Sequence, residues 1–145
     1  MARSCLRMRA RRSTESRRLS ESERVKDPTS VYVATLEKMA DVEGDAGLMK
    51  SGARDWNRLV KRLQEARKAV AQSDDGRRFV AALMKDERVT VKLWSASHAL
   101  HWPEFSEVAR RELESIAAER RNGLNRLNAE MTLSEFDAGR LNPEW

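Results

Sequence analysis

Cysteine is almost absent from this chain, which has a single one, Cys5, among its 145 residues. One cysteine cannot form an internal disulfide, so we expect a fold that depends on packing alone and a protein of the reducing cytoplasm. Long apolar runs are missing too, and the first residues lack the continuous apolar core of a secretory signal peptide. We therefore expect neither a membrane anchor nor a secretory signal.

The sequence also lacks the motifs of the common enzyme classes. It has no Walker loop, dinucleotide-binding fingerprint, paired-cysteine motif or Gly-x-Ser-x-Gly elbow. Cys5 has no ordered base near it in the sequence and is a poor candidate nucleophile. The acidic stretch from Asp41 resembles a calcium loop, but its twelfth position is Gly52, where a bidentate glutamate is needed. We expect a protein that is not an enzyme and holds no cofactor.

The net surplus of positive over negative charge is confined to the first part of the chain. Residues 1–27 hold nine basic and four acidic residues, a surplus that equals the whole net charge of +5. Residues 28–145 hold 19 residues of each sign and are neutral. The high isoelectric point is therefore a property of an N-terminal tail, and it does not indicate a basic binding face on the remainder.

The tail is rich in arginine and serine and has few large apolar residues, so we expect residues 1–27 to be disordered. An extension in front of the true start is an alternative, since Met8 is a second start codon position, and a targeting signal ranks third. If the tail binds nucleic acid, its arginines are the candidate phosphate contacts. These are Arg7, Arg9, Arg11, Arg12, Arg17 and Arg18.

Hydrophobic periodicity predicts an all-α fold of about six helices for residues 28–145, which we expect to form a single domain. Asp27 and Pro28 are a typical helix start. The Asp27 carboxylate can accept hydrogen bonds from the free N–H groups of the first turn, and proline suits the first helical position. Pro103 is predicted to end one helix and start the next. The expected helices are 28–44, 53–72, 77–85, 89–102, 103 to about 117, and 133–138.

The helix predicted at 89–102 is apolar on two faces, which indicates a position between partners at the centre of the stack. The helix predicted after Pro103 has its own apolar side, which we expect to face the core. The residues on that inner side are Phe105, Val108, Ala109, Leu113, Ile116 and Ala117. The residues predicted to form the structural core are Trp56, Leu63, Leu93, Trp94, Leu100, Phe105, Leu113, Ile116 and Phe136.

The last predicted helix rests on local capping patterns. Thr132 and Glu135 have the spacing of a capping box, and Met131 and Phe136 have that of a hydrophobic staple. Gly139 suits the C′ position that follows a helix. These patterns together predict a short helix at 133–138.

The two histidines, His98 and His101, share a helix face at i, i+3 and are the only candidates for a metal site. Glu104 or Glu107 would have to complete that site, but Pro103 interrupts the helix before either of them. We expect both histidines to be packed and hydrogen-bonded, and no metal.

Residues Leu83 to Asp86, with Val91, Lys92, Ala96 and Leu100, resemble one HEAT or armadillo-like helix pair. The stretches VTVKLWSASHAL, PEFSEVARRELESIA and MTLSEFDAGRLNP also make residues 30 to 145 similar to the bacterial domain-of-unknown-function family numbered two thousand and nineteen. The resemblance implies a small right-handed HEAT/armadillo-like stack, and it carries no catalytic residue. The chain departs from that pattern at Trp94 and at Ser95.

Two functions of different class remain. The first is a non-enzymatic protein-interaction module, for which an inhibitor or immunity-type partner of a larger protein is a special case. The second is weak, non-specific association with nucleic acid through the N-terminal tail. The neutral charge of residues 28–145 favours the first.

Overall fold

The computed structural model describes residues 27–44 and 47–141. Within these ranges it contains six α-helices, one 3-10 turn and no strand. The prediction of an all-α fold of about six helices is confirmed, whereas the predicted disorder of the tail concerns residues outside the described ranges, apart from Asp27. The helices are α2 (Pro28–Gly44), α3 (Gly47–Val70), α4 (Asp74–Leu83), α5 (Val89–Ala99), α6 (Ser106–Ala118) and α7 (Leu124–Asp137), with η1 (Arg120–Asn122) before α7.

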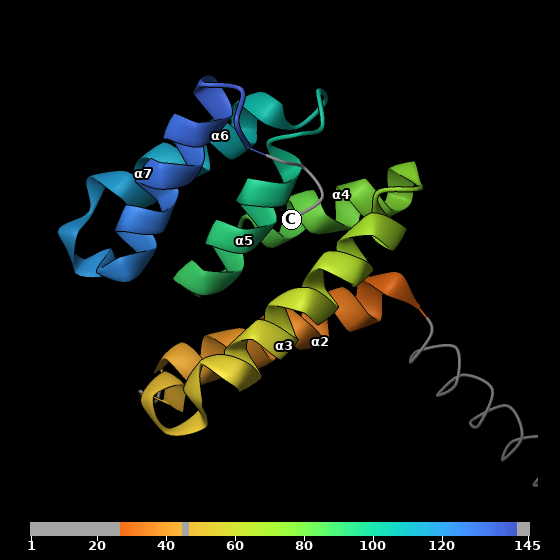
Figure 1. Cartoon of the computed structure of the whole chain (residues 1–145). Helices are drawn as coiled ribbons and strands as arrows, with labels where there is room; N and C mark the ends of the chain where they lie inside the picture. Colours follow the sequence, from red (N-terminus) through yellow and green to blue (C-terminus); the bar gives the residue numbers. More distant parts are fainter. Residues whose placement is uncertain (1–26, 45–46, 142–145) are drawn as a thin grey trace, which may run out of the picture.

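Two helix pairs enclose a central helix (Figure 1). Helices α2 and α3 run side by side as a hairpin, and α6 and α7 form a second pair. Helix α5 contacts α2, α4, α6 and α7, as expected for a helix that is apolar on two faces. The right-handed HEAT-like arrangement stays a prediction. None of the described helices is both long and apolar enough to cross a membrane.

Helix α2 starts where the sequence predicts, at Pro28. The Asp27 carboxylate accepts hydrogen bonds from the Thr29 backbone N–H at 3.3 Å and from the Ser30 hydroxyl at 3.0 Å. These bonds satisfy donors that the first turn of a helix leaves free. They also lower the pKa of Asp27, with the Thr29 hydroxyl as the largest contributor.

Helix α4 starts earlier than predicted, at Asp74 instead of Arg77. Ser73 is its N-cap, and the Ser73 hydroxyl accepts from the Gly76 N–H at 3.0 Å. The Ser-Asp-Asp-Gly stretch therefore starts a helix, since its polar groups satisfy the first-turn donors. Gly76 is required for space, because a Cβ there would lie 2.1 Å from the Val70 carbonyl oxygen.

The predicted transition at Pro103 is wrong. Helix α5 ends at Ala99 and α6 begins at Ser106, so a corner of several turns separates them. In this corner Trp102 N–H donates to the Ala99 carbonyl at 3.0 Å, and Phe105 N–H donates to the Trp102 carbonyl at 2.9 Å. These i to i+3 bonds form tight turns before α6. Pro103 is the second residue of the turn from Trp102 to Phe105, a position that suits its fixed φ.

The predicted capping box is also wrong, because α7 runs unbroken from Leu124 to Asp137. The Thr132 hydroxyl donates to the Asn128 carbonyl one turn earlier, at 2.7 Å, and so belongs to the helix interior. Met131 is 64% exposed and lies within α7, so it is not the residue before a helix start that a hydrophobic staple requires. Gly139, with φ of 73°, is confirmed at C′.

The core lies around α5 and joins the inner faces of all six helices. Five of the predicted core residues are buried (Leu63, Leu93, Leu100, Leu113 and Ile116), and four are half-buried against the core (Trp56, Trp94, Phe105 and Phe136). Val108 was expected on the inner side of α6 but is 47% exposed. The inner stripe of α6 follows Ala109, Leu113 and Ile116, and Val108 is turned about 100° away from it.

Candidate interaction groove

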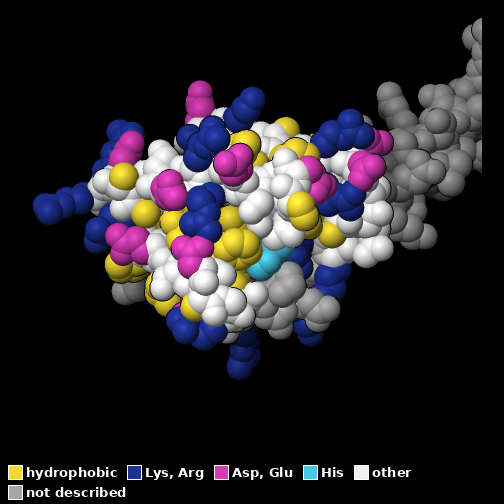
Figure 2. Space-filling view, turned by 90° about the horizontal axis from the view of Figure 1, so that it is seen from above, with side chains coloured by type: hydrophobic (Ala, Val, Ile, Leu, Met, Phe, Trp, Pro, Cys, Tyr) yellow, Lys and Arg dark blue, Asp and Glu magenta, His cyan; other side chains and the backbone are white. Residues whose placement is uncertain are grey.

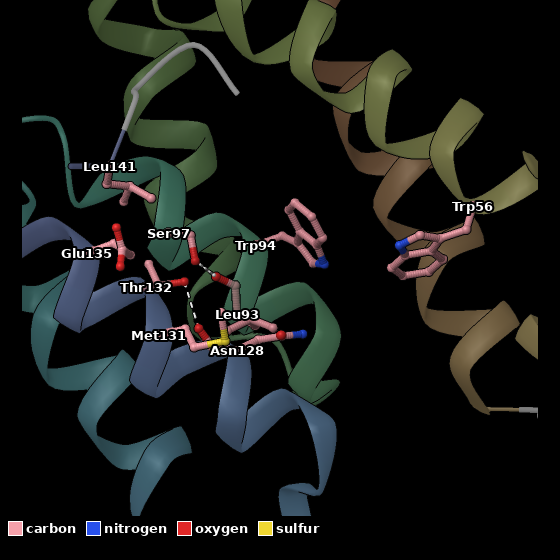
Figure 3. Close-up of a pocket in the computed structure, with 9 residues that line it drawn as sticks. All are labelled: Trp56, Leu93, Trp94, Ser97, Asn128, Met131, Thr132, Glu135 and Leu141. Atoms are coloured by element: carbon pink, nitrogen blue, oxygen red, sulfur yellow. Dashed lines mark hydrogen bonds between the residues drawn. The ribbon is translucent and has the colours of Figure 1, made fainter. Parts of the chain in front are cut away.

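An open groove lies between α3, α5 and α7, with a volume of about 300 Å³ (Figure 3). Trp56 of α3 lies on one side, and Met131 with its neighbours on α7 lies on the other. Helix α5 forms the floor. We call this the interaction groove, and its lining residues are Trp56, Leu93, Trp94, Ser97, Asn128, Met131, Thr132, Glu135 and Leu141.

Two tryptophans give the groove its aromatic surface. The Trp56 and Trp94 rings meet edge to face, with their centroids 6.5 Å apart. The geometry is one of the preferred aromatic pairings, and both side chains remain half-buried. Large rigid aromatic side chains that are only half-buried offer contact area to a partner at little entropic cost.

The polar side chains of the groove are mostly bonded within the protein. The Ser97 hydroxyl donates to the Leu93 carbonyl at 2.6 Å, and the Thr132 hydroxyl donates to the Asn128 carbonyl at 2.7 Å. Glu135 pairs with Arg140 at 2.9 Å, and this hydrogen bond lowers the pKa of Glu135. The surface therefore presents chiefly carbon to solvent and suits an apolar ligand.

An exposed apolar stripe on α7 extends the groove. Leu124, Leu127 and Met131 are 71%, 44% and 64% exposed, and their spacing of three and four residues puts them on one face of the helix. Exposed apolar groups that are contiguous with a groove are typical of binding surfaces.

Charges of both signs are mixed on the surface of the described helices. Figure 2 shows lysine and arginine side chains interspersed with aspartate and glutamate on the face in view, without a region of one sign. On α7 itself Arg126 and Glu130 form an i, i+4 pair at 3.5 Å. This mixed distribution of charge gives no electrostatic reason to favour a polyanion in the groove.

Beneath the groove lies a buried polar cluster that was not predicted. The Tyr32 hydroxyl and His98 Nδ1 are 2.6 Å apart and share a hydrogen bond. Burial, the charge of Arg67 and the nearby His101 together lower the pKa of His98 to about 3. Burial raises the pKa of Tyr32. Both groups are therefore neutral at pH 7, and their rings support Trp94, whose centroid lies 6.2 Å from that of His98.

His101 does not share a helix face with His98, because α5 ends at Ala99. Its ring packs edge to face on Phe136 of α7 at 5.5 Å, and burial followed by the charge of Arg67 lowers its pKa. Within residues 27–44 and 47–141 no group of three or more His, Cys, Asp and Glu side chains has the geometry to hold a metal ion. The predicted packing is confirmed for both histidines, and the predicted hydrogen bond is confirmed for His98.

The candidate phosphate contacts of the tail cannot be placed against this surface. They are Arg7, Arg9, Arg11, Arg12, Arg17 and Arg18, and all lie outside the described residues.

Sequence reasoning missed most of the groove. The i, i+3, i+7 spacing of Leu124, Leu127 and Met131 was present in the sequence, but it is equally typical of a buried helix face. Arg67 and Tyr32 share apolar helix faces with Leu63 and Leu36, respectively. Arginine is rarely buried, however, and helical spacing alone does not show which faces other helices cover.

No family model matches this chain, and neither does any curated protein or solved structure. The resemblance to the bacterial family of unknown function therefore stays a prediction.

Proposed function

We propose that the protein is a non-enzymatic interaction module that holds an amphipathic helix of a partner protein in the interaction groove. The observation that carries this proposal is the continuity of the Trp56–Trp94 pair with the exposed stripe of Leu124, Leu127 and Met131. This apolar surface costs free energy in water, and a partner that covers it would recover that free energy.

A helix fits the shape of this surface. The stripe on α7 and the wall formed by α3 are themselves helical, and a helix laid between them would present anchors at i, i+3 or i+4, and i+7. The tryptophans would form the energetic centre, since buried aromatic residues dominate most interfaces. Serine and threonine hydroxyls that are already bonded to carbonyls would add no unpaired polar group on binding.

A module of this kind needs no chemistry of its own. An inhibitor or immunity-type partner of a larger protein would act by occupying that protein's exposed helix. The neutral charge of residues 28–145 and the mixed charges on the face in Figure 2 favour a protein over a nucleic acid as the ligand of the groove.

Site-specific photo-crosslinking in the native cell tests the proposal. A photoreactive phenylalanine analogue replaces Met131 in one strain and Val108 in a second. Val108 is the matched control, because it is also an exposed apolar side chain but lies on α6 away from the groove lining. We expect a single partner to be crosslinked from position 131, through a helical segment, and none from position 108.

The affinity of the crosslinked partner gives the second measurement. Trp94→Ala should weaken binding about 30-fold, as loss of an interface anchor worth about 2 kcal/mol predicts. Val108→Ala should leave the affinity unchanged. Equal crosslinking from both positions, or a partner that binds the Trp94→Ala protein normally, would show that the groove is not the docking surface.

A further inference from the structure

Helix α3 carries a local surplus of positive charge that the neutral total of residues 28–145 conceals. It holds seven basic and two acidic residues, so the rest of residues 28–145 holds 12 basic and 17 acidic ones. A total charge of zero does not show how the charges are distributed in space. Figure 1 shows α3 beside α2 at the margin of the fold, so one side of this helix is open to solvent.

The basic residues of α3 form a straight stripe on this open side. Arg54, Arg58, Lys61 and Lys68 are separated by four, three and seven residues, a spacing that keeps side chains on one helix face. Arg62 follows Arg58 by four residues and borders the same face. All five side chains are exposed. At 1.5 Å per residue they extend over about 21 Å, and we call these five residues the basic stripe.

No carboxylate of the described residues forms an ion pair with the basic stripe. Glu65 lies on the same face, between Lys61 and Lys68, and Asp55 borders it, yet neither is paired with a residue of the stripe. Eight arginines of other elements do form ion pairs with nearby carboxylates. The cations of the stripe therefore give up no intramolecular ion pair when they bind an anion.

The composition of the stripe distinguishes among anionic ligands. Among residues 54–70 no large apolar side chain is exposed. A protein interface is organised around apolar and aromatic residues, and a helix that lies on a membrane inserts an apolar face. The phosphates of a nucleic acid require only charged and hydrogen-bonding side chains. A duplex segment about 21 Å long carries roughly 12 phosphates, which is enough for every cation of the stripe.

We propose that the basic stripe binds the phosphate backbone of a nucleic acid, without sequence preference. Trp56 follows Arg54 by two residues and therefore lies about 200° around the helix, on the opposite side of α3. The interaction groove, which Trp56 lines, and the stripe thus lie on different sides of α3 and do not compete. The proposal does not depend on the proposed function, since each surface can bind its own ligand.

Fluorescence anisotropy of a labelled DNA duplex, titrated with the full chain at several salt concentrations, tests the stripe. The arginines of the tail can bind the same duplex, so the comparison is between variants that keep the tail and have equal net charge. The stripe variant combines Arg58→Gln, Lys61→Gln and Lys68→Gln, since glutamine is a good helix former. The control variant combines Lys85→Gln, Arg111→Gln and Arg120→Gln, which replace exposed basic residues outside α3.

The stripe variant should bind DNA with a shallower dependence on salt. Each phosphate contact that is lost lowers the slope of log affinity against log salt by about 0.9, up to about 2.7 for three contacts. At about 0.1 M salt the affinity should fall tenfold or more. The control variant should keep the slope of the unmutated chain, because its replaced residues lie off the stripe.

Glu65→Gln is expected to improve binding, a result that misfolding would not produce. The Glu65 carboxylate repels phosphates that lie on the stripe, so its removal should tighten binding by up to about fivefold. Glu114→Gln, at an exposed position of α6, is the matched control and should leave the affinity unchanged. This comparison decides the matter if circular dichroism shows that the stripe variant does not fold.

Three results would overturn the proposal. The first is the absence of duplex binding by the unmutated chain at low salt. The second is an equal loss of slope in the stripe and control variants or, if the stripe variant does not fold, equal affinities of the Glu65→Gln and Glu114→Gln proteins. The third is stripe-dependent binding to phosphatidylserine vesicles or to polyglutamate that is tighter than binding to DNA, which would assign the stripe to a membrane or to an acidic protein. Because no partner is present, failure of the proposed function would leave these results unaffected.

Discussion

Helices α5 and α7 use apolar residues in opposite ways. In α5, eight of eleven residues are buried, including Ser95 and Ser97, whereas in α7 only Ala129 and Thr132 of fourteen residues are buried. The difference lies in their neighbours, since α5 is contacted by four helices and α7 by α5, α6 and the short turn before it. Burial is therefore set by the number of packing partners, and the apolar content of a helix alone does not predict it.

Polar residues in α5 are compatible with burial because their hydrogen bonds are made within the helix. The Ser95 hydroxyl donates to the Val91 carbonyl at 2.7 Å, and the Ser97 hydroxyl donates to the Leu93 carbonyl at 2.6 Å. A satisfied hydroxyl costs little in a core. Leu127 and Met131 of α7 show the converse, since apolar side chains remain exposed where no helix covers them.

Truncation of one apolar side chain in each region gives the largest expected contrast. Leu100, directly after α5, is 1% exposed, so Leu100→Ala should lower the free energy of unfolding by about 2–5 kcal/mol. Met131→Ala should change it by less than about 0.5 kcal/mol, because the side chain lies largely in solvent. Urea denaturation measures both. Similar losses would contradict the contrast between the two regions.

Acidification should destabilise the α5 region through His98. Its folded pKa of about 3 lies below the ordinary value of 6.5, so the unfolded chain binds the proton and folding stability falls as pH drops below 6.5. From pH 7 to pH 5 this loss amounts to about 2 kcal/mol. His101 adds to it in the same direction.

His98→Gln should remove most of this pH dependence when urea denaturation is repeated at pH 7 and pH 5. Gln is the suitable replacement, since its amide retains a partner for the Tyr32 hydroxyl without titrating. A protein with His98→Gln that loses as much stability as the unmutated chain would show that His98 is not the titrating group.

Tyr32→Phe tests the hydrogen bond beneath the groove and has a smaller expected effect. The change removes the hydroxyl that lies 2.6 Å from His98 Nδ1, which should cost about 1 kcal/mol, or up to about 3 kcal/mol if the imidazole is left unsatisfied. Val33→Ala, at a half-buried position one residue along α2, provides a comparison by the same denaturation measurement. An unchanged free energy of unfolding in Tyr32→Phe would indicate that the hydrogen bond makes no net contribution to stability.

The smallest effect is expected from the N-terminal tail, because both regions compared above lie beyond it. Deletion of residues 1–26 should leave the thermal unfolding midpoint essentially unchanged.

If the tail alone attracts duplex DNA, the binding should be weak, and the logarithm of its affinity should fall with the logarithm of the salt concentration, with a slope of about −0.9 for each phosphate neutralised. Salt-resistant DNA binding by residues 28–145 would contradict the proposal of a protein partner.

Local sequence patterns predicted helix ends where one interaction dominates. Asp27 starts α2 because its carboxylate satisfies the first turn, and Gly139 ends α7 because it adopts a positive φ. The same kind of pattern was misleading at Thr132, where the hydroxyl can bond either forward as a cap or backward to a carbonyl. Proline favours a helix start, but Pro103 lies in the turn that precedes α6, and the helix begins three residues later at Ser106.

The groove was beyond the reach of such patterns. Trp94 was predicted as core and is half-buried, because one of its sides faces the gap between α3 and α7. Arg67 is buried although its charge favours exposure. It shares the apolar face of α3 with Leu63 and Val70, but helical spacing alone does not show that a charged residue on this face is covered. Both outcomes depend on which helices meet.

The sequence by itself determined an all-α protein with a central apolar helix, because helical periodicity and capping are local properties that each segment carries alone. Only the tertiary structure decided which apolar faces are covered. Packing places α5 among four neighbours and leaves one face of α7 without any, so residues of the same hydrophobicity become core in the first helix and an open groove beside the second.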